Sequence, residues 1–132
     1  MSQENVEDYR RSVAAWNSGE LDDWLATTSP DFEFRTSGAF PGLQPVYRGS
    51  DGARQFWSDM RDPWTDFRIS VERVEDLDDA VLALITFQVR GRDGLATSRR
   101  WAQVATYDGG RLVVSENYPS WDEALKAVGL EE

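Results

Sequence analysis

The spacing of hydrophobic and polar residues changes once along this chain, from a helical period to a strand period. From Asn5 to Trp16, apolar residues recur every three or four positions, which is typical of a helix with one buried face. Asn17-Ser18-Gly19 follows, and a glycine at such a place indicates the end of a helix. A second, short helix is predicted from Leu21 to about Thr27, and Ser29-Pro30-Asp31 indicates a turn.

A short strand, a long loop and a third helix are predicted next. Residues 32–36 alternate between apolar and polar, as in a strand with one buried face. Residues 37–49 contain several glycines and prolines, and loops of this length often cover a functional site, with Phe40 as one apolar anchor here. Ser50 or Asp51 can begin the third helix, which Pro63 ends.

The rest of the chain predicts four strands and a closing helix. The strands are expected at residues 67–74, 81–90, 97–107 and 112–118, with turn sequences between them. The closing helix, residues 121–128, begins with a capping box formed by Ser120 and Glu123. Helices followed by consecutive antiparallel strands predict one α+β domain over residues 1–132.

Both faces of the predicted sheet are apolar. In the strand 81–90, Val81, Ala83 and Ile85 share one face, and Leu82 and Leu84 share the other. A strand that is apolar on both faces needs cover on both. We expect the N-terminal helices to cover one face and a second copy of the chain to cover the other, giving a homodimer through the open sheet face. The closing helix is the alternative cover.

Composition and charge exclude several classes of function. The chain has 132 residues without cysteine or histidine, so disulfides, thiolate metal sites, cysteine nucleophiles and Ser-His-Asp triads are absent. A net charge of −10 argues against binding to nucleic acid or to anionic membranes. No apolar run is long enough to span a bilayer, and no secretory signal is evident. We therefore expect a cytoplasmic protein that holds no metal and no cofactor.

Aromatic residues are the more informative excess. Six Trp, six Phe and four Tyr are more than a core of this size ordinarily needs. A pocket lined by rings and a few neutral amides would suit a flat, largely apolar ligand. The alternative is that the rings form an ordinary core and the amides are satisfied within the sheet. By alternation, the ligand-binding residues are predicted to be Trp16, Phe34, Phe56, Trp57, Phe87, Arg99, Trp101, Gln103, Tyr107, Ser115 and Asn117.

Three segments of the sequence resemble a known superfamily. They are AAWNSGELDDWLATTSPDFEFR, VYRGSDGARQFW and the hairpin ATYDGGRLVV. Together with the order of elements, they resemble the SnoaL-like and ketosteroid-isomerase-like branch of the nuclear transport factor 2-like superfamily. The resemblance covers nearly the whole chain and implies a cystatin-like, cone-shaped fold, usually dimeric, in which a curved antiparallel sheet wraps around the N-terminal helices and a central pocket. Its members include isomerases, cyclases, epoxide hydrolases and dehydratases, so it predicts the fold better than the reaction.

The resemblance also implies positions for catalytic groups, and in this chain they are neutral. The isomerase-like positions fall on Ser12, Thr36 and Gln103, none of which moves a proton readily near pH 7. The epoxide-hydrolase positions fall on Trp101, Gln103 and Asn117. A shift of one residue in the last strand would turn Glu116 inward instead of Asn117.

Three functions therefore remain open from the sequence. The first is binding of a small, largely apolar molecule, aromatic or terpenoid-like, without turnover. The second is an isomerase-, cyclase- or hydratase-type enzyme that uses Glu116 or Asp59 as its base with help from Arg99. The third is a non-catalytic dimerisation module.

Overall fold

The computed structural model describes residues 2–36 and 42–130. Within these residues it contains four helices and one six-stranded sheet, so the expected α+β class is confirmed. In chain order the elements are α1 (Ser2–Ser18), α2 (Leu21–Leu25), β1 (Thr28–Arg35), β2 (Val46–Arg48), α3 (Gly49–Arg61), β3 (Trp64–Asp76), β4 (Val81–Gly91), β5 (Ala96–Asp108), β6 (Arg111–Tyr118) and α4 (Trp121–Ala127).

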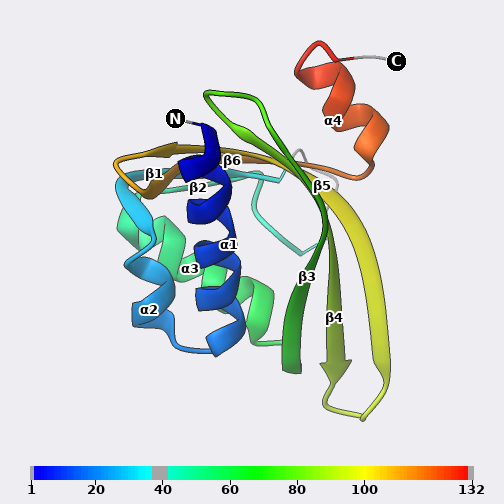
Figure 1. Ribbon diagram of the computed structural model, residues 1–132. Helices are drawn as coiled ribbons and strands as arrows, with labels where there is room; N and C mark the ends of the chain where they lie inside the picture. The colour runs from blue at the N-terminus through cyan, green and yellow to red at the C-terminus, as the bar shows by residue number, and fades with distance from the viewer. Residues whose placement is uncertain (1, 37–41, 131–132) are drawn as a thin grey trace.

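The sheet curves around the first three helices. Its strand order is β2-β1-β6-β5-β4-β3. In the part of the chain that the structure describes, β1 and β6 form the one parallel pair, and every other neighbouring pair is antiparallel. Figure 1 shows α1, α2 and α3 on the concave side of the sheet and α4 on the opposite side. The main core, which includes Trp16, Phe32, Phe56 and Ile85, therefore lies between the three helices and the concave face.

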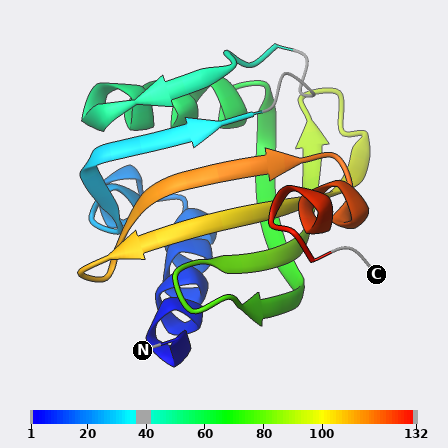
Figure 2. The same ribbon diagram turned by 90° about the horizontal axis from the view of Figure 1, so that it is seen from above.

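A smaller core lies on the convex face, under α4. Leu82, Ala102 and Val104 point to this face and pack with Ala124 and Leu125 of α4. Figure 2 shows α4 lying across one end of the sheet. The closing helix thus covers part of the surface for which a second copy of the chain was expected.

The remaining convex face is more polar than the sequence pattern suggested. Glu72 accepts hydrogen bonds from Thr86 and from Arg100, whose Nε lies 2.8 Å from the carboxylate. The hydrogen bonds from Thr86 and, next in size, from Arg100 hold the pKa of Glu72 below its usual value. Leu84 is only half-buried there. Apolar positions on both faces are therefore concentrated at the α4 end of the sheet.

The end of α1 is fixed to β3 by one side chain. The Asn17 amide donates to the carbonyl oxygen of Ile69 at 2.9 Å, and its oxygen accepts from the Ile69 backbone N–H at 2.7 Å. Because β3 is last in the strand order, this amide takes the place of a neighbouring strand for one residue. Gly19 then ends the helical segment with a φ of 77°, a conformation that favours glycine.

Most predicted elements are confirmed, with differences near β1. The turn expected at residues 29–31 lies inside β1, where the pairing with β6 is irregular between Thr28 and Glu33. That irregularity accommodates Pro30, which has no N–H to donate. The short strand β2 lies within the predicted loop 37–49, and residues 37–41 of that loop, with the proposed anchor Phe40, lie outside the described residues. β3 begins at Trp64, three residues earlier than predicted.

None of the helices among the described residues has the length and apolar character needed to cross a membrane.

Candidate functional site

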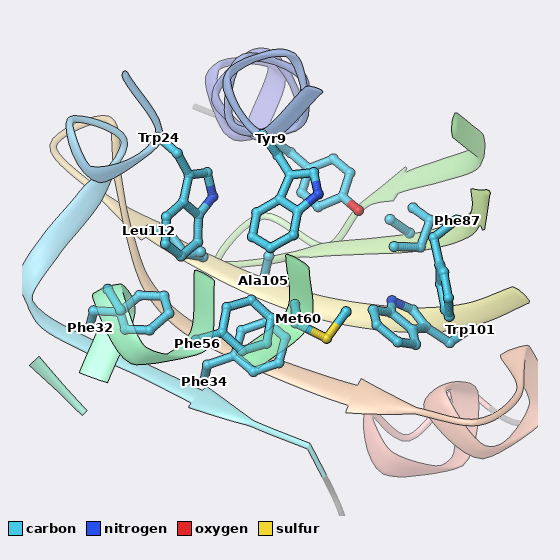
Figure 3. Close-up of a cluster of buried hydrophobic side chains, with 14 of the residues drawn as sticks. Tyr9, Trp24, Phe32, Phe34, Phe56, Met60, Phe87, Trp101, Ala105 and Leu112 are labelled. Atoms are coloured by element: carbon cyan, nitrogen blue, oxygen red, sulfur yellow. The ribbon is translucent and has the colours of Figure 1, made fainter. Parts of the chain in front are cut away.

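A small cavity lies between α1, α3 and the concave face of the sheet. Figure 3 shows Tyr9 and Trp24 above it, Phe34 and Phe56 below it, and Met60 beside Trp101 at one end. The residues that line it are Tyr9, Ser12, Val13, Trp16, Trp24, Phe34, Phe56, Met60, Ile69, Trp101, Gln103, Ala105, Tyr107, Leu112 and Ser115. No described residue of the lining carries a charge.

The cavity is narrow. Its volume is about 50 Å³. A dry cavity of roughly 150 Å³ is known to hold benzene, and a single water needs only about 10–15 Å³. The cavity can thus hold water as it stands, whereas an aromatic ring requires a side chain to move.

A chain of neutral hydrogen bonds crosses the sheet side of the cavity. The Tyr9 hydroxyl donates to Gln103 Oε1 at 2.7 Å, and Gln103 Nε2 donates to Asn117 Oδ1, also at 2.7 Å. Asn117 Nδ2 in turn reaches the carbonyl oxygen of Arg35 at 3.1 Å. Asn117 is fully buried, so these bonds satisfy an amide that would otherwise be costly to place there. This series of hydrogen bonds holds the Gln103 amide in one orientation at the cavity wall.

A second polar pair joins α1 to β5. The Tyr107 hydroxyl donates to Ser12 Oγ at 2.9 Å. Burial raises the pKa of both Tyr107 and Tyr9 well above the usual value for tyrosine. Both phenols are therefore protonated near pH 7 and serve as hydrogen-bonding groups there.

Trp16 supplies a buried donor without a partner. Its side chain is 3% exposed, and its Nε1–H makes no hydrogen bond with any described residue. The ring is held firmly, because Trp24 and Trp57 pack against it at centroid distances of 5.3 and 4.9 Å. The guanidinium of Arg61 lies 5.1 Å from the ring centroid and donates to the Trp16 carbonyl oxygen. An acceptor that entered the cavity would satisfy this N–H.

The predicted ligand-binding residues fall into two groups. Seven of them line the cavity: Trp16, Phe34, Phe56, Trp101, Gln103, Tyr107 and Ser115. Asn117 lies directly behind Gln103. The other three lie elsewhere: Trp57 packs behind Trp16, and Phe87 and Arg99 line a separate groove outside the cavity.

The three catalytic candidates do not line this cavity. Asn117, not Glu116, faces inward, and Glu116 lies on the convex face, 3.6 Å from Arg35 and in contact with the Tyr118 hydroxyl. Asp59 accepts from the Tyr47 hydroxyl at 2.6 Å and from Gln55 at 2.7 Å. Burial and the bond to Asp59 raise the pKa of Tyr47 to about 12. Arg99 is exposed at the rim.

The side chains at the three positions carried over from the isomerase-like relatives are all hydrogen-bonded within the protein. Ser12 and Gln103 line the cavity and are bonded to Tyr107 and Tyr9. Thr36 is buried, and its hydroxyl donates to the carbonyl oxygen of Gln44 at 2.9 Å. None of them is a carboxylate, and no described carboxylate replaces them in the lining. The described lining thus offers polar groups of the hydroxyl, amide and indole kind only.

Sequence reasoning missed several lining residues. Tyr9 and Val13 belong to the same helical stripe as Ser12 and Trp16, and that spacing could have identified them. Trp24, Met60 and Leu112 come from three different elements, and no local pattern connects them.

No three acidic side chains within residues 2–36 and 42–130 come together as a metal ligand set.

A curved sheet that encloses helices and a small neutral cavity defines a pocket-forming α+β protein. The chain belongs to the SnoaL-like domain family, whose model matches residues 9–115. The curated proteins include no match to it.

Solved structures share this fold at low sequence identity. A nuclear transport factor 2-like protein of unknown function from Burkholderia pseudomallei superimposes with a TM-score of 0.77 at 20% identity, covering 93% of this chain and 95% of that one. TerC, co-crystallized with polyporic acid, gives 0.76 at 18% identity, covering 96% and 97%. An epoxide hydrolase from M. tuberculosis, of the type named LEH-like, gives 0.75 at 18% identity, covering 90% and 84%. Such likeness establishes the fold and not the activity.

Proposed function

We propose that this chain binds a small, largely apolar molecule, aromatic or terpenoid-like, in the cavity between α1, α3 and the sheet, without converting it. The observation that carries the proposal is the buried Trp16 side chain, which lines the ring-lined cavity and whose Nε1–H has no partner among the described residues. A ligand with an acceptor oxygen would supply the missing bond.

The neutral polar groups support binding rather than turnover. The side-chain oxygen of Gln103 is bonded to Tyr9 and its nitrogen to Asn117, so its role at the wall is to orient a bound ligand. Hydrogen bonds to neutral, fixed groups select a ligand by the position of its oxygen atoms. The fold neighbour co-crystallized with polyporic acid is consistent with a small-molecule site in this architecture.

The first experiment is a ligand screen with a matched pair of variants. Aromatic ketones, lactones and fatty acids are titrated while tryptophan fluorescence and the melting temperature are recorded. Trp16→Phe keeps a ring but removes the donor, so we expect affinity for a bound ketone to fall about 2- to 12-fold, the range of one neutral hydrogen bond. Trp121→Phe makes the same change on α4, across the sheet, and is expected to leave affinity unchanged.

Two results would contradict the proposal. One is that no class of compound changes fluorescence or melting temperature in the unmodified chain. The other is that the Trp16 and Trp121 variants lose affinity equally, which would mean that the donor plays no part.

A second candidate function is a non-catalytic dimerisation module, favoured by the small volume of the cavity. We propose that such a homodimer would form through the convex face, where Leu84 and Val114 are half-buried beyond α4. Sedimentation equilibrium at micromolar concentration distinguishes the two states, because one chain has a mass of 15.0 kDa. A single species of that mass would exclude the dimer under those conditions.

A further inference from the structure

A groove adjoins the cavity and shares two lining residues with it. Its volume is about 370 Å³, within the range of about 300–1,000 Å³ that is usual for small-ligand sites. Phe67 and Phe87 stack with their ring centroids 5.4 Å apart, and the Trp101 ring lies 4.7 Å from Phe87 with its plane inclined by 52°, so the three rings form a buried aromatic cluster beneath the groove. Trp64 and Pro63 add apolar walls.

Met60 and Trp101 separate the groove from the cavity. Both residues line both spaces, and Figure 3 shows the Met60 sulfur beside the Trp101 ring. Methionine is unbranched and can change rotamer more readily than the surrounding rings. Of the two residues, Met60 is thus the one whose movement would widen the cavity toward the groove at the lower cost, and the cavity needs such a movement to hold a ring.

Arg99 gives the groove a cationic rim. It is exposed, and it makes no ion pair or hydrogen bond with any residue that the structure describes. Asp59 lines the same groove, but the hydroxyl of Tyr47 and the amide of Gln55 occupy its two oxygens. These neutral donors do not cancel the charge of the carboxylate, so the described lining of the groove holds one acidic and one basic side chain, and Arg99 is the one whose donor groups have no described partner.

We infer that this groove binds a flat aromatic monocarboxylate, with its rings between the apolar walls above the Phe67–Phe87–Trp101 cluster and its carboxylate on Arg99, and that the ligand reaches the inner cavity past Met60. The inference rests on the proposed function and specifies the chemical class of its ligand. An arginine suits a carboxylate because its planar fork can donate two parallel hydrogen bonds. The net charge of −10 opposes anions in general, so recognition depends on this local contact.

The test compares two probes of equal shape and different charge. 2-Naphthoate and 2-naphthamide share the same rings, and only the first is an anion at pH 7. Isothermal titration at low salt is expected to show naphthoate binding about fivefold more tightly, the upper range for an exposed ion pair. Arg99→Gln should remove this preference and leave naphthamide binding unchanged. Arg68→Gln removes the same unit of charge on the other face of the sheet, where the preference should persist.

The outcomes separate this inference from the proposed function. If both probes bind equally to the unmodified chain, or if Arg68→Gln and Arg99→Gln reduce the preference equally, the carboxylate assignment is wrong and the apolar site stands. If neither probe binds, the inference about the groove is overturned, and the proposed function is decided separately by the screen of ketones, lactones and fatty acids. Loss of the preference at 0.5 M salt, together with its loss in Arg99→Gln alone, supports the inference.

Discussion

At the scale of single residues, side-chain amides connect elements through paired hydrogen bonds, as backbone groups do between neighbouring strands. The Asn17 amide is hydrogen-bonded to both the N–H and the carbonyl oxygen of Ile69. The Gln103–Asn117 pair links the Tyr9 hydroxyl to the sheet. Each amide offers a donor and an acceptor at fixed spacing. A substitution that removes one of them leaves two partners unsatisfied, which is why these positions are sensitive.

Asn17→Ala is expected to lower the free energy of unfolding by about 2 kcal/mol, because two partly buried hydrogen bonds at the edge of β3 are lost. Asn5→Ala is the matched control on the same helix. Its amide makes one exposed bond to the Asp78 carbonyl oxygen, so a change of about 0.5 kcal/mol or less is expected. Urea titration followed by circular dichroism measures both, and equal effects would contradict the role given to Asn17.

At the scale of elements, close packing of α3 on β2 determines where the cavity floor lies. A Cβ atom added at Gly52 would lie 2.9 Å from the backbone carbonyl carbon of Tyr47. A backbone atom cannot move aside as a side chain can, so the helix can lie this close only because residue 52 is a glycine. Phe56 and Met60, further along α3, are thereby held against the sheet.

Gly52→Ala tests this packing, because two effects oppose each other. Alanine favours a helix over glycine by about 1 kcal/mol, whereas overpacking costs about 1–3 kcal/mol. We expect net destabilisation, with a lower melting temperature. Arg54→Ala, at an exposed position of the same helix, should change stability by no more than about 0.5 kcal/mol. A Gly52→Ala chain more stable than the parent would show that helix propensity dominates.

The same scale explains which features could be predicted from sequence. Alternation placed Trp101 and Gln103 on the concave face and Leu82 and Val104 on the convex one, because the period of two persists along β4 and β5. Alternation indicates which face of the sheet a side chain is on, but not whether its position along the strand is buried or exposed. Arg99 therefore shares a face with Gln103 yet lies at the rim.

Pairing between distant segments was the other limit. The three-residue strand β2 is too short to show a period, and no local pattern indicates that β1 pairs in parallel with β6. Likewise, the helical stripe of α1 predicts that Trp16 is buried, but the contribution of Met60 to the same cavity depends on how α3 packs. Contacts of this kind depend on tertiary structure.

At the scale of the whole molecule, the chain is poor in groups that titrate near neutral pH and rich in buried phenols. Histidine is absent, and each of the four tyrosines has a pKa raised above its usual value, with burial as the largest cause. A phenol that ionises more readily in the unfolded chain adds stability below its unfolded pKa of about 10 and loses that contribution as pH rises toward its folded pKa.

We therefore expect stability to fall above about pH 10, where the unfolded state loses phenolic protons that the folded state keeps. Absorbance at 295 nm should show little tyrosine ionisation at pH 10 and then a steep rise that coincides with loss of the far-ultraviolet circular dichroism signal. Four tyrosines ionising near pH 10 with the fold intact would contradict the burial described for Tyr9 and Tyr107.

The central position of β6 has a consequence for synthesis on the ribosome. β6 lies between β1 and β5, so a nascent chain that lacks it would hold β2-β1 and β5-β4-β3 as separate pieces. Two short strands are marginal by themselves in water. The nascent chain should thus remain open to proteases until β6 has left the exit tunnel, and then close in one late, cooperative step.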